Sequence, residues 1–498
     1  MNISTMFSST ILSWCDSKIV LLFLFVLLLL ISSRRKRIRI NFPPGPWVIP
    51  LLQDVLTGFD HHAADKAAKK YGNIFSVWRG CVKIVYVSGF QMVHEVLVTQ
   101  GDNFLDRPVS PLYNEAFKGN GISVSNGYRW RRQRHFSVSH MKSIGNGGRT
   151  MELNILKECA LLCGAIQEEQ GGAFDPHMKI NHAVANVIGF LIFGKCFSSN
   201  SPDFQALLNL SAESVSLVHT PLAQLYDMCP WIMRRLPGPH EIILSNYSKL
   251  AYFVRKQIEI HKKDWDPFYH RDFVDSYIGE IDKRRKDTEA GFRVENLAYC
   301  TLDMFEAGTE TVTSTLRWAL LNMIKYPVIQ EEVHSEIERV VGRSRPPCLA
   351  DRVYMPYTNA VLHETQRLGN ILPMNTPRVA RRDTTLGGYL IPQGTMVITS
   401  LSSVLHDKSE WETPLQFNPY HFLDSQGSFR KREAFFAFSA GKRMCLGEHL
   451  AQMELFLFFT SLLQRFSFSS PPGPELSLEA QGTAVMAPRP FKVHASPR

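Results

Sequence analysis

Ten residues near the C-terminal end of the chain constrain its fold more than any other segment. Phe438 to Gly447 read F-S-A-G-K-R-M-C-L-G, which fills every fixed position of the pattern F-x-x-G-x-R-x-C-x-G. Gly441 permits the positive φ that a tight ligand loop often needs. Phe438 can pack beside the sulfur, and Arg443 can form charge-assisted hydrogen bonds with an anionic group. The pattern predicts that Cys445 is a haem-binding thiolate, a ligand that pushes electron density onto iron.

The segment resembles the cysteine loop of the cytochrome P450 family, the haem-thiolate monooxygenases. A buried structural cysteine is the alternative, because free Cys is among the most buried residue types. The resemblance runs from Pro43 to about Phe491 and is closest to microsomal family 2, especially the J subfamily linked to arachidonate and other unsaturated fatty acids. It implies a mainly α fold with small β-sheets, in which a single large catalytic domain follows an N-terminal membrane anchor.

The N-terminal segment predicts that anchor. Ile19 to Ile31 is an unbroken apolar run, and residues 11–33 reach the length that spans a bilayer. The basic residues Arg34 to Arg39 follow the run, whereas a cleaved signal peptide carries its basic residues first. The positive-inside rule then places the body in the cytosol. We expect a signal anchor at 1–33, a basic and proline-rich hinge at 34–50 and the haem-thiolate domain at 51–498, on the endoplasmic reticulum membrane.

Charge and cysteine usage exclude two other classes of protein. The net charge is +9, but residues 1–39 hold six basic residues against Asp16, so most of the excess lies beside the anchor. This distribution argues against a nucleic-acid-binding protein. The nine cysteines are odd in number and irregularly spaced, which argues against a disulfide framework. Cys159 and Cys163 lie four residues apart without a second zinc-type pair, so we interpret them as core or surface thiols.

Helical patterns dominate the body. Residues 294–325 predict one very long helix that Pro327 ends, and residues 450–466 are apolar nearly all round, as in a buried helix. Residues 74–78 and 82–87 are rich in β-branched and aromatic residues and predict a hairpin. A second small sheet is expected to involve 384–386 and 396–399.

The middle of the long helix carries A-G-T-E-T at residues 307–311. Gly308 in a helix interior costs roughly 1 kcal/mol relative to Ala, and beside the small Ala307 it would leave room for dioxygen over iron. Glu310 and Thr311 resemble the family's acid–alcohol pair, which delivers protons to the distal oxygen. By themselves, a Glu and a Thr on a helix are more often surface and filler residues. Their position before a complete cysteine loop favours the functional interpretation.

Four further residues are expected to hold the haem. Trp130 and Arg134 form W-x-x-x-R, and their i,i+4 spacing puts both on one helical face. The resemblance assigns this pair to one haem propionate, and it assigns two further propionate contacts to Arg107 and Arg378. Arginine suits this role because its planar donors match carboxylates.

A structural motif supports the same family. Glu364 and Arg367 form E-x-x-R, whose i,i+3 spacing brings both side chains to one face. An ordinary surface ion pair is the alternative. In the family the pair belongs to a buried network with a third member from a P-E-R-F-like segment. His421 stands at the arginine position of that segment here, as is common in the microsomal branch that oxidises drugs and fatty acids.

The resemblance implies an NADPH- and O2-dependent monooxygenase with haem b that hydroxylates or epoxidises lipophilic molecules such as arachidonate and xenobiotics. Electrons would come from NADPH through a membrane-bound NADPH-cytochrome reductase, with cytochrome b5 as a second donor. The substrate pocket would use residues 112–128, 303–307, 372–376 and 485–486. Two alternatives remain, a peroxide isomerase or dehydratase on the same scaffold and a non-catalytic haem sensor or carrier. Glu310 and Thr311 argue against the isomerase, which needs no proton delivery.

Overall fold

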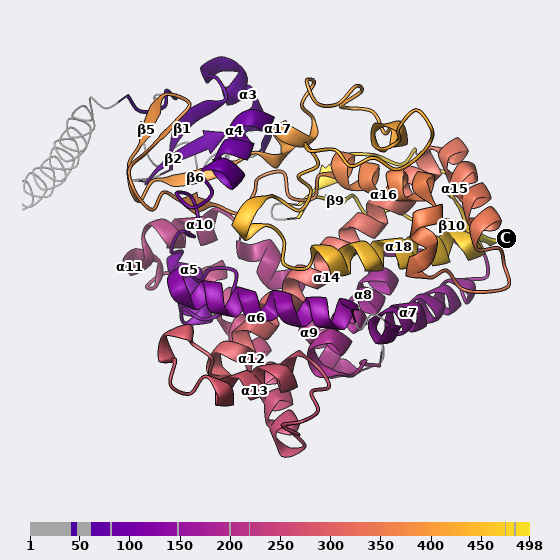
Figure 1. The fold of residues 1–498 in the computed structure, drawn as a ribbon, viewed down its shortest axis with the longest axis horizontal. Helices are drawn as coiled ribbons and strands as arrows, with labels where there is room; N and C mark the ends of the chain where they lie inside the picture. The colour runs from indigo at the N-terminus through magenta and orange to yellow at the C-terminus, as the bar shows by residue number, and fades with distance from the viewer. Residues whose placement is uncertain are drawn as a thin grey trace, which may run out of the picture.

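A computed structural model describes residues 41–46, 61–79, 82–146, 149–198, 201–218, 220–473, 475–482 and 485–498. The described chain is mostly helical with small sheets, which confirms the predicted fold class (Figure 1). The predicted anchor and most of the predicted hinge lie outside these residues. In the part of the chain that the structure covers, no helix combines the length and the apolarity needed to cross a membrane.

The long central helix is confirmed with the ends that the sequence predicts. α14 spans Val294–Lys325, and Pro327 begins the next helix. In Figure 1, α14 runs through the helical body. It packs against α8 (His177–Phe193), α12 (Pro239–Lys263), α16 (Pro356–Gly369) and α18 (Glu448–Arg465). Helix α18 is buried along most of its length, as its apolar sequence predicts.

The other helices surround this core. They are α3 (His61–Tyr71), α4 (Phe90–His94), α5 (Pro111–Phe117), α6 (Gly127–Asn146), α7 (Arg149–Gln167), α9 (Pro202–Val218), α10 (Pro221–Met228), α11 (Pro230–Met233), α13 (Phe273–Lys283), α15 (Pro327–Val340) and α17 (Leu401–Leu405). Cys159 and Cys163 are buried on α7, so they are core thiols.

The predicted hairpin is confirmed, but the predicted pairing of the second sheet is wrong. β1 (Ile74–Arg79) pairs antiparallel with β2 (Val82–Val87). β4 (Thr384–Leu386) pairs with β5 (Tyr389–Ile391), whereas β6 (Met396–Thr399) joins β2 in parallel. β4 has its nearest sequence neighbour as its partner, while β6 has a partner more than 300 residues away in the chain, which local sequence does not encode.

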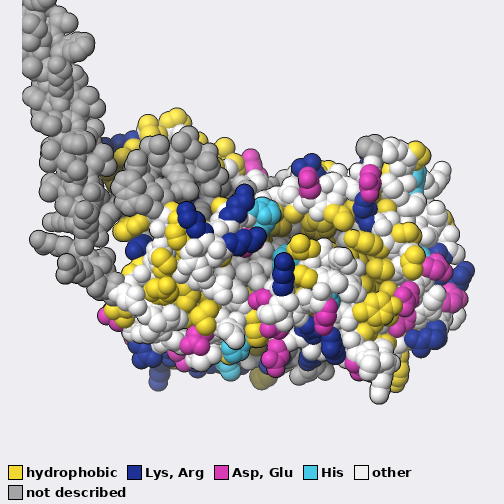
Figure 2. All heavy atoms as spheres, turned by 90° about the horizontal axis from the view of Figure 1, so that it is seen from above, with side chains coloured by type: hydrophobic (Ala, Val, Ile, Leu, Met, Phe, Trp, Pro, Cys, Tyr) yellow, Lys and Arg dark blue, Asp and Glu magenta, His cyan; other side chains and the backbone are white. Residues whose placement is uncertain are grey.

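The remaining strands are short. β3 (Arg378–Val379) borders β6, β7 (Phe466–Ser469) pairs with β10 (His494–Pro497), and β8 (Ala480–Gln481) pairs with β9 (Ala487–Pro488). The face drawn in Figure 2 carries hydrophobic side chains interspersed with charged side chains of both signs. Such a mixture is ordinary for the surface of a folded domain.

The E-x-x-R pair forms a buried network. Glu364 and Arg367 are both fully buried, and two N–H···O hydrogen bonds of 2.7 Å join them. His421 Nδ1 lies 3.2 Å from both Glu364 oxygens. Arg367 also donates to the backbone carbonyls of Leu405 and Pro414. The network therefore ties α16 to the loops that lead to the cysteine segment.

Candidate active site

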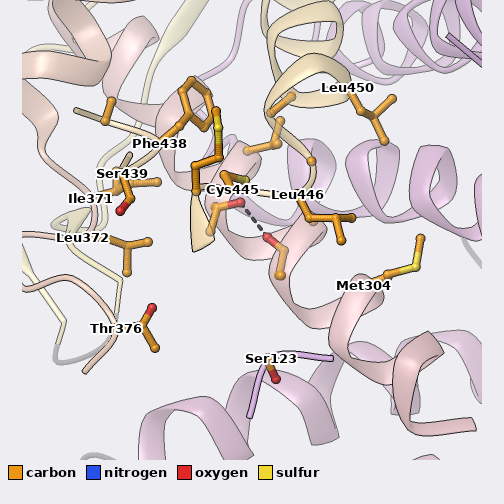
Figure 3. A pocket seen from close by; sticks show the side chains of 18 of the residues that line it. Ser123, Met304, Ile371, Leu372, Thr376, Phe438, Ser439, Cys445, Leu446 and Leu450 are labelled. Atoms are coloured by element: carbon orange, nitrogen blue, oxygen red, sulfur yellow. Dashed lines mark hydrogen bonds between the residues drawn. The ribbon is translucent and has the colours of Figure 1, made fainter. Parts of the chain in front are cut away.

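A cavity of about 330 Å³ lies between α14 and the cysteine loop (Figure 3). In Figure 3, Cys445 and Phe438 lie on a different side of the cavity from Ser123 and Thr376. Eight of the ten residues predicted for the site line its wall: Arg107, Trp130, Arg134, Ala307, Thr311, Phe438, Arg443 and Cys445. Glu310 and Arg378 are not part of the wall.

The cysteine loop has the tight geometry that its sequence predicts. The backbone N–H of Cys445 donates to the carbonyl of Phe438 at 2.9 Å. Gly441 has φ 73°, and a Cβ there would collide with the backbone oxygen of Leu97, so only glycine fits. Arg134 Nη2 donates to the carbonyl of Met444 at 2.7 Å, which fixes the loop next to the cysteine.

Cys445 is exposed and lines the cavity. Burial raises the pKa of the thiol, and the backbone N–H of Gly447 and the positive charge of Arg134 oppose that shift. A thiol in this position becomes a thiolate when it coordinates a metal ion. The environment therefore suits a ligand that stays protonated until it binds a metal.

The guanidinium groups of Arg107, Arg134, Arg378 and Arg443 lie close enough to interact electrostatically, and all but that of Arg378 line the cavity. Arg107 and Arg443 donate to backbone carbonyls at 2.7–3.0 Å. The Cζ atom of Arg443 lies 3.7 Å from the centre of the Trp130 ring. Arg378 is buried on β3, and within the described residues its Nε and Nη2 atoms have no hydrogen-bond partner, like Nε of Arg107.

The charges of this cluster are incompletely balanced by the protein. Burial, with Arg378 and Arg134 nearby, lowers the pKa of Arg443 to about 9, although Asp106 opposes the shift. Burial and Arg134 lower the pKa of Arg378 to about 10. Buried charges are normally paired, so this cluster fits a ligand with carboxylates. Haem b, whose two propionates would meet the guanidiniums while its iron faces Cys445, fits these residues.

The α14 side of the cavity differs in two ways from the sequence prediction. Thr311 faces the cavity, as predicted, and its hydroxyl donates to the Ala307 carbonyl at 2.6 Å. Glu310 points elsewhere and accepts from Ser314 at 3.1 Å, and burial raises the pKa of its carboxyl. At Gly308 a Cβ would lie 2.6 Å from the Cδ1 of Ile188. A Cβ at this position would force the Ile188 side chain of α8 to move, so Gly308 favours close packing of the two helices as well as space inside the cavity.

The predicted pocket segments are only partly confirmed. From residues 112–128, only Ile122 and Ser123 reach the wall, because α5 occupies residues 111–117. Asp303, Met304 and Ala307 line it, as do Leu372 and Thr376. Residues 485–486 do not, since Met486 instead donates from its backbone N–H to the carbonyl of Ile371.

Three carboxyls on α14 and α18 were missed by sequence reasoning. Asp303 accepts from the side chain of Ser123 and holds that loop against α14. Glu306 accepts from Tyr247 at 3.2 Å. Glu454 is fully buried in the cavity wall, and neither of its oxygens has a partner in the described structure. An acidic residue in an otherwise apolar helical stretch was the available signal for all three.

Comparison with known proteins decides the family. The family model described as Cytochrome P450 matches residues 41–495. The chain belongs to the cytochrome P450 family. It is 46% identical to cytochrome P450 2J2 of Homo sapiens over 461 residues, 92% of each chain. It is 45% identical to cytochrome P450 2J1 of Oryctolagus cuniculus over 479 residues, 96% of this chain and 94% of that one.

A third relative is cytochrome P450 2J3 of Rattus norvegicus, with 43% identity over 485 residues, 97% of this chain and 96% of that one. The resemblance to the J subfamily of family 2 is thereby confirmed. As a cytochrome P450, the chain is a haem-thiolate monooxygenase that uses haem b and receives electrons from NADPH through a reductase.

Proposed function

We propose that Cys445 ligates the haem iron and that Arg107, Trp130, Arg134, Arg378 and Arg443 hold the propionates. Phe438 shields the sulfur and Ala307 borders the oxygen site. The single observation that carries this assignment is the exposure of the Cys445 sulfur to a cavity beside four guanidiniums with incompletely balanced charge. When bound, haem activates dioxygen and transfers one oxygen atom to the substrate.

Glu310 and Thr311 are the proposed proton donors. The Thr311 hydroxyl donates to Ala307, so its lone pairs remain free to accept a hydrogen bond on the cavity side. Glu310 is held by Ser314 away from the cavity, and burial raises the pKa of its carboxyl, so that the carboxyl holds its proton more firmly than an exposed one and can donate it. Thr311 would orient the water that carries this proton.

Replacement of Thr311 tests the proton role. Thr311→Ala removes the hydroxyl and should raise the peroxide formed per NADPH consumed, with haem content unchanged. Thr311→Ser keeps a hydroxyl and should stay coupled. The role is refuted if both variants form product and peroxide in the same ratio as the parent protein.

We further propose that the substrates are unsaturated fatty acids such as arachidonate, together with xenobiotics. Met304, Ile122 and Leu372 give the cavity an apolar lining that suits such molecules. Reconstitution with NADPH-cytochrome reductase and a mixed lipid and drug library, followed by mass analysis of the products, tests this. Activity without NADPH would instead favour the isomerase or dehydratase. Binding of haem and substrate with no NADPH consumed in the presence of reductase would favour a haem sensor or carrier.

The location proposed for the protein is the endoplasmic reticulum membrane, with the body in the cytosol and cytochrome b5 as an additional electron donor. The apolar run at 19–31 and the basic residues after it support this orientation. Deletion of residues 1–33 should weaken membrane association and leave haem bound. Loss of haem on deletion would contradict the division into an anchor at 1–33, a hinge at 34–50 and a haem-thiolate domain at 51–498.

A further inference from the structure

A row of polar side chains follows one face of α14 and begins at Glu310, next to Thr311 in the cavity wall. Glu310, Ser314 and Arg317 stand at positions i, i+4 and i+7, which a helix brings to one side. The Ser314 hydroxyl donates to Glu310 at 3.1 Å. Arg317 is buried one turn further along, and its positive charge lowers the pKa of Glu310, against the larger effect of burial. The three side chains therefore form a polar file within a buried helix.

Helix α8 lies against α14 in a register that two contacts define. The Cβ position of Gly308 is next to Ile188, and Thr313 Oγ1 donates to Asn181 Oδ1 at 3.4 Å. Residue numbers rise along α14 while they fall along α8, so the helices are antiparallel. One more turn brings the first residue of α8 close to the far end of the polar file.

That first residue is His177, which connects the polar file to the surface. Its backbone N–H donates to Oδ1 of Asp175 at 2.8 Å, and Asp175 is exposed to solvent. Burial lowers the pKa of His177, and the positive charge of Arg317 lowers it further, while Asp175 opposes both. His177, Arg317 and Asp175 are therefore close enough for their charges to interact.

Two buried nitrogen atoms at this junction lack a protein partner. They are Nε2 of His177 and Nε of Arg317, neither of which has a hydrogen bond within the described residues. The Nη2 atom of Arg317 donates to the Pro488 carbonyl at 3.0 Å, so the guanidinium is fixed in place. Buried polar groups without a protein partner commonly bind ordered water. Water at this junction would join the imidazole to the file.

We propose that Asp175, His177 and Arg317 form the solvent entrance of a proton route that ends at Glu310. The inference rests on the proton-donor role proposed for Glu310. A ring nitrogen of His177 takes a proton from bulk water, and the imidazole releases one inward to water held by Arg317. That water, with the Ser314 hydroxyl, reprotonates the Glu310 carboxylate. Each transfer breaks one bond to hydrogen and forms another, and no electrons move, so the net change is one proton from solvent to Glu310.

Arg317 acts here as a positioning residue. Its guanidinium stays protonated, holds the water and stabilises the Glu310 carboxylate after each release. His177 is the residue that exchanges protons with solvent, so its replacement should slow proton entry and leave the fold unchanged. It lies at the partly exposed start of α8, where glutamine is tolerated sterically.

The test compares His177→Gln with His182→Gln. His182 lies on the same helix, and its Nε2 is also buried without a partner in the described chain, but its ring packs against Phe204 on α9. Two quantities are measured: product per NADPH in the reconstituted holoenzyme, and the rate at which the Glu310 carboxyl exchanges its proton in D2O, followed by infrared spectroscopy of the resting holoenzyme. Glu310→Gln identifies the carboxyl band by removing it.

We expect His177→Gln to lower product per NADPH at least about threefold and to slow exchange by a similar factor, a modest effect for a proton-transfer group because some water bypasses it. His182→Gln should change neither quantity. Unchanged exchange in His177→Gln, or equal losses in both variants, would overturn the route. If Glu310→Gln itself leaves coupling intact, the role proposed for Glu310 fails and the route fails with it. If Glu310→Gln lowers product per NADPH but His177→Gln does not, the role of Glu310 stands and only the proposed solvent entrance is wrong.

Discussion

Replacement of Arg378 by glutamine should have opposite effects on the haem-free and the haem-bound protein. Arg378 is 3% exposed, and two of its nitrogen atoms lack partners among the described residues. Burial and Arg134 lower the pKa of its guanidinium from its ordinary value to about 10. Each unit corresponds to about 1.4 kcal/mol, so the charged group destabilises the haem-free fold by about 3 kcal/mol. This cost is fully present below pH 10 and disappears as the pH rises above 10 toward the ordinary pKa of a guanidinium.

Arg378→Gln should therefore stabilise the haem-free protein by up to about 3 kcal/mol and weaken haem binding. Urea unfolding of the haem-free protein measures the first effect, and the rate of haem transfer to an excess of apomyoglobin measures the second. Arg131→Gln is the matched control, because Arg131 is exposed on α6, one turn from Arg134. The reasoning is refuted if Arg378→Gln destabilises the haem-free protein, or if its rate of haem loss equals that of the control.

Three further predictions concern the loop, the buried network and a buried acid. Gly441→Ala should lower the free energy of unfolding by at least about 1–2 kcal/mol, because alanine is strained in the left-handed backbone conformation of this position. On warming, the variant should therefore lose its thiolate spectrum at a lower temperature than the parent protein. Arg367→Met removes the guanidinium that pairs with buried Glu364, which keeps His421 and the backbone N–H of Asn418 as partners. The change should cost about 3–5 kcal/mol in thermal unfolding; a loss below 1 kcal/mol would contradict the buried network. Burial, with Asp303 nearby, raises the pKa of Glu306 to about 8. The free energy of unfolding should therefore fall by up to about 1.4 kcal/mol per pH unit as the pH rises from 4.5 to 8. Glu306→Gln should make this pH dependence weaker.

The structural features that were predicted correctly are those that neighbouring residues in the sequence determine. The ends of α14 were correct because Pro327 cannot continue a helix that ends at Lys325. The φ of Gly441 was correct because the cysteine loop is defined within ten residues. The pairing predicted between residues 384–386 and β6 was wrong, because β6 lies between β3 and β2, and β2 is far away in the chain and carries no local signal of that pairing.

In the site, too, features set by neighbouring residues were predicted correctly, whereas contacts between distant segments were not. Residues of the cysteine loop and of W-x-x-x-R reached the cavity as expected. The sequence placed Glu310 and Thr311 together as adjacent residues, but adjacent helical positions differ by about 100° in direction, so only Thr311 lines the cavity. The role expected for Gly308 omitted Ile188, because contacts between helices depend on register, which spacing within one helix does not reveal.

The spectrum of the reduced, carbon-monoxide-treated protein tests the central claim most directly, because it reports the atom bound to the haem iron opposite carbon monoxide. A thiolate from Cys445 predicts the strongly red-shifted Soret band of that ligand. Cys445→His, if it retains haem, should shift the band back to the position given by an imidazole ligand. A parent protein that binds haem yet lacks the red-shifted band, or a Cys445→His variant that keeps it, would contradict the assignment of Cys445.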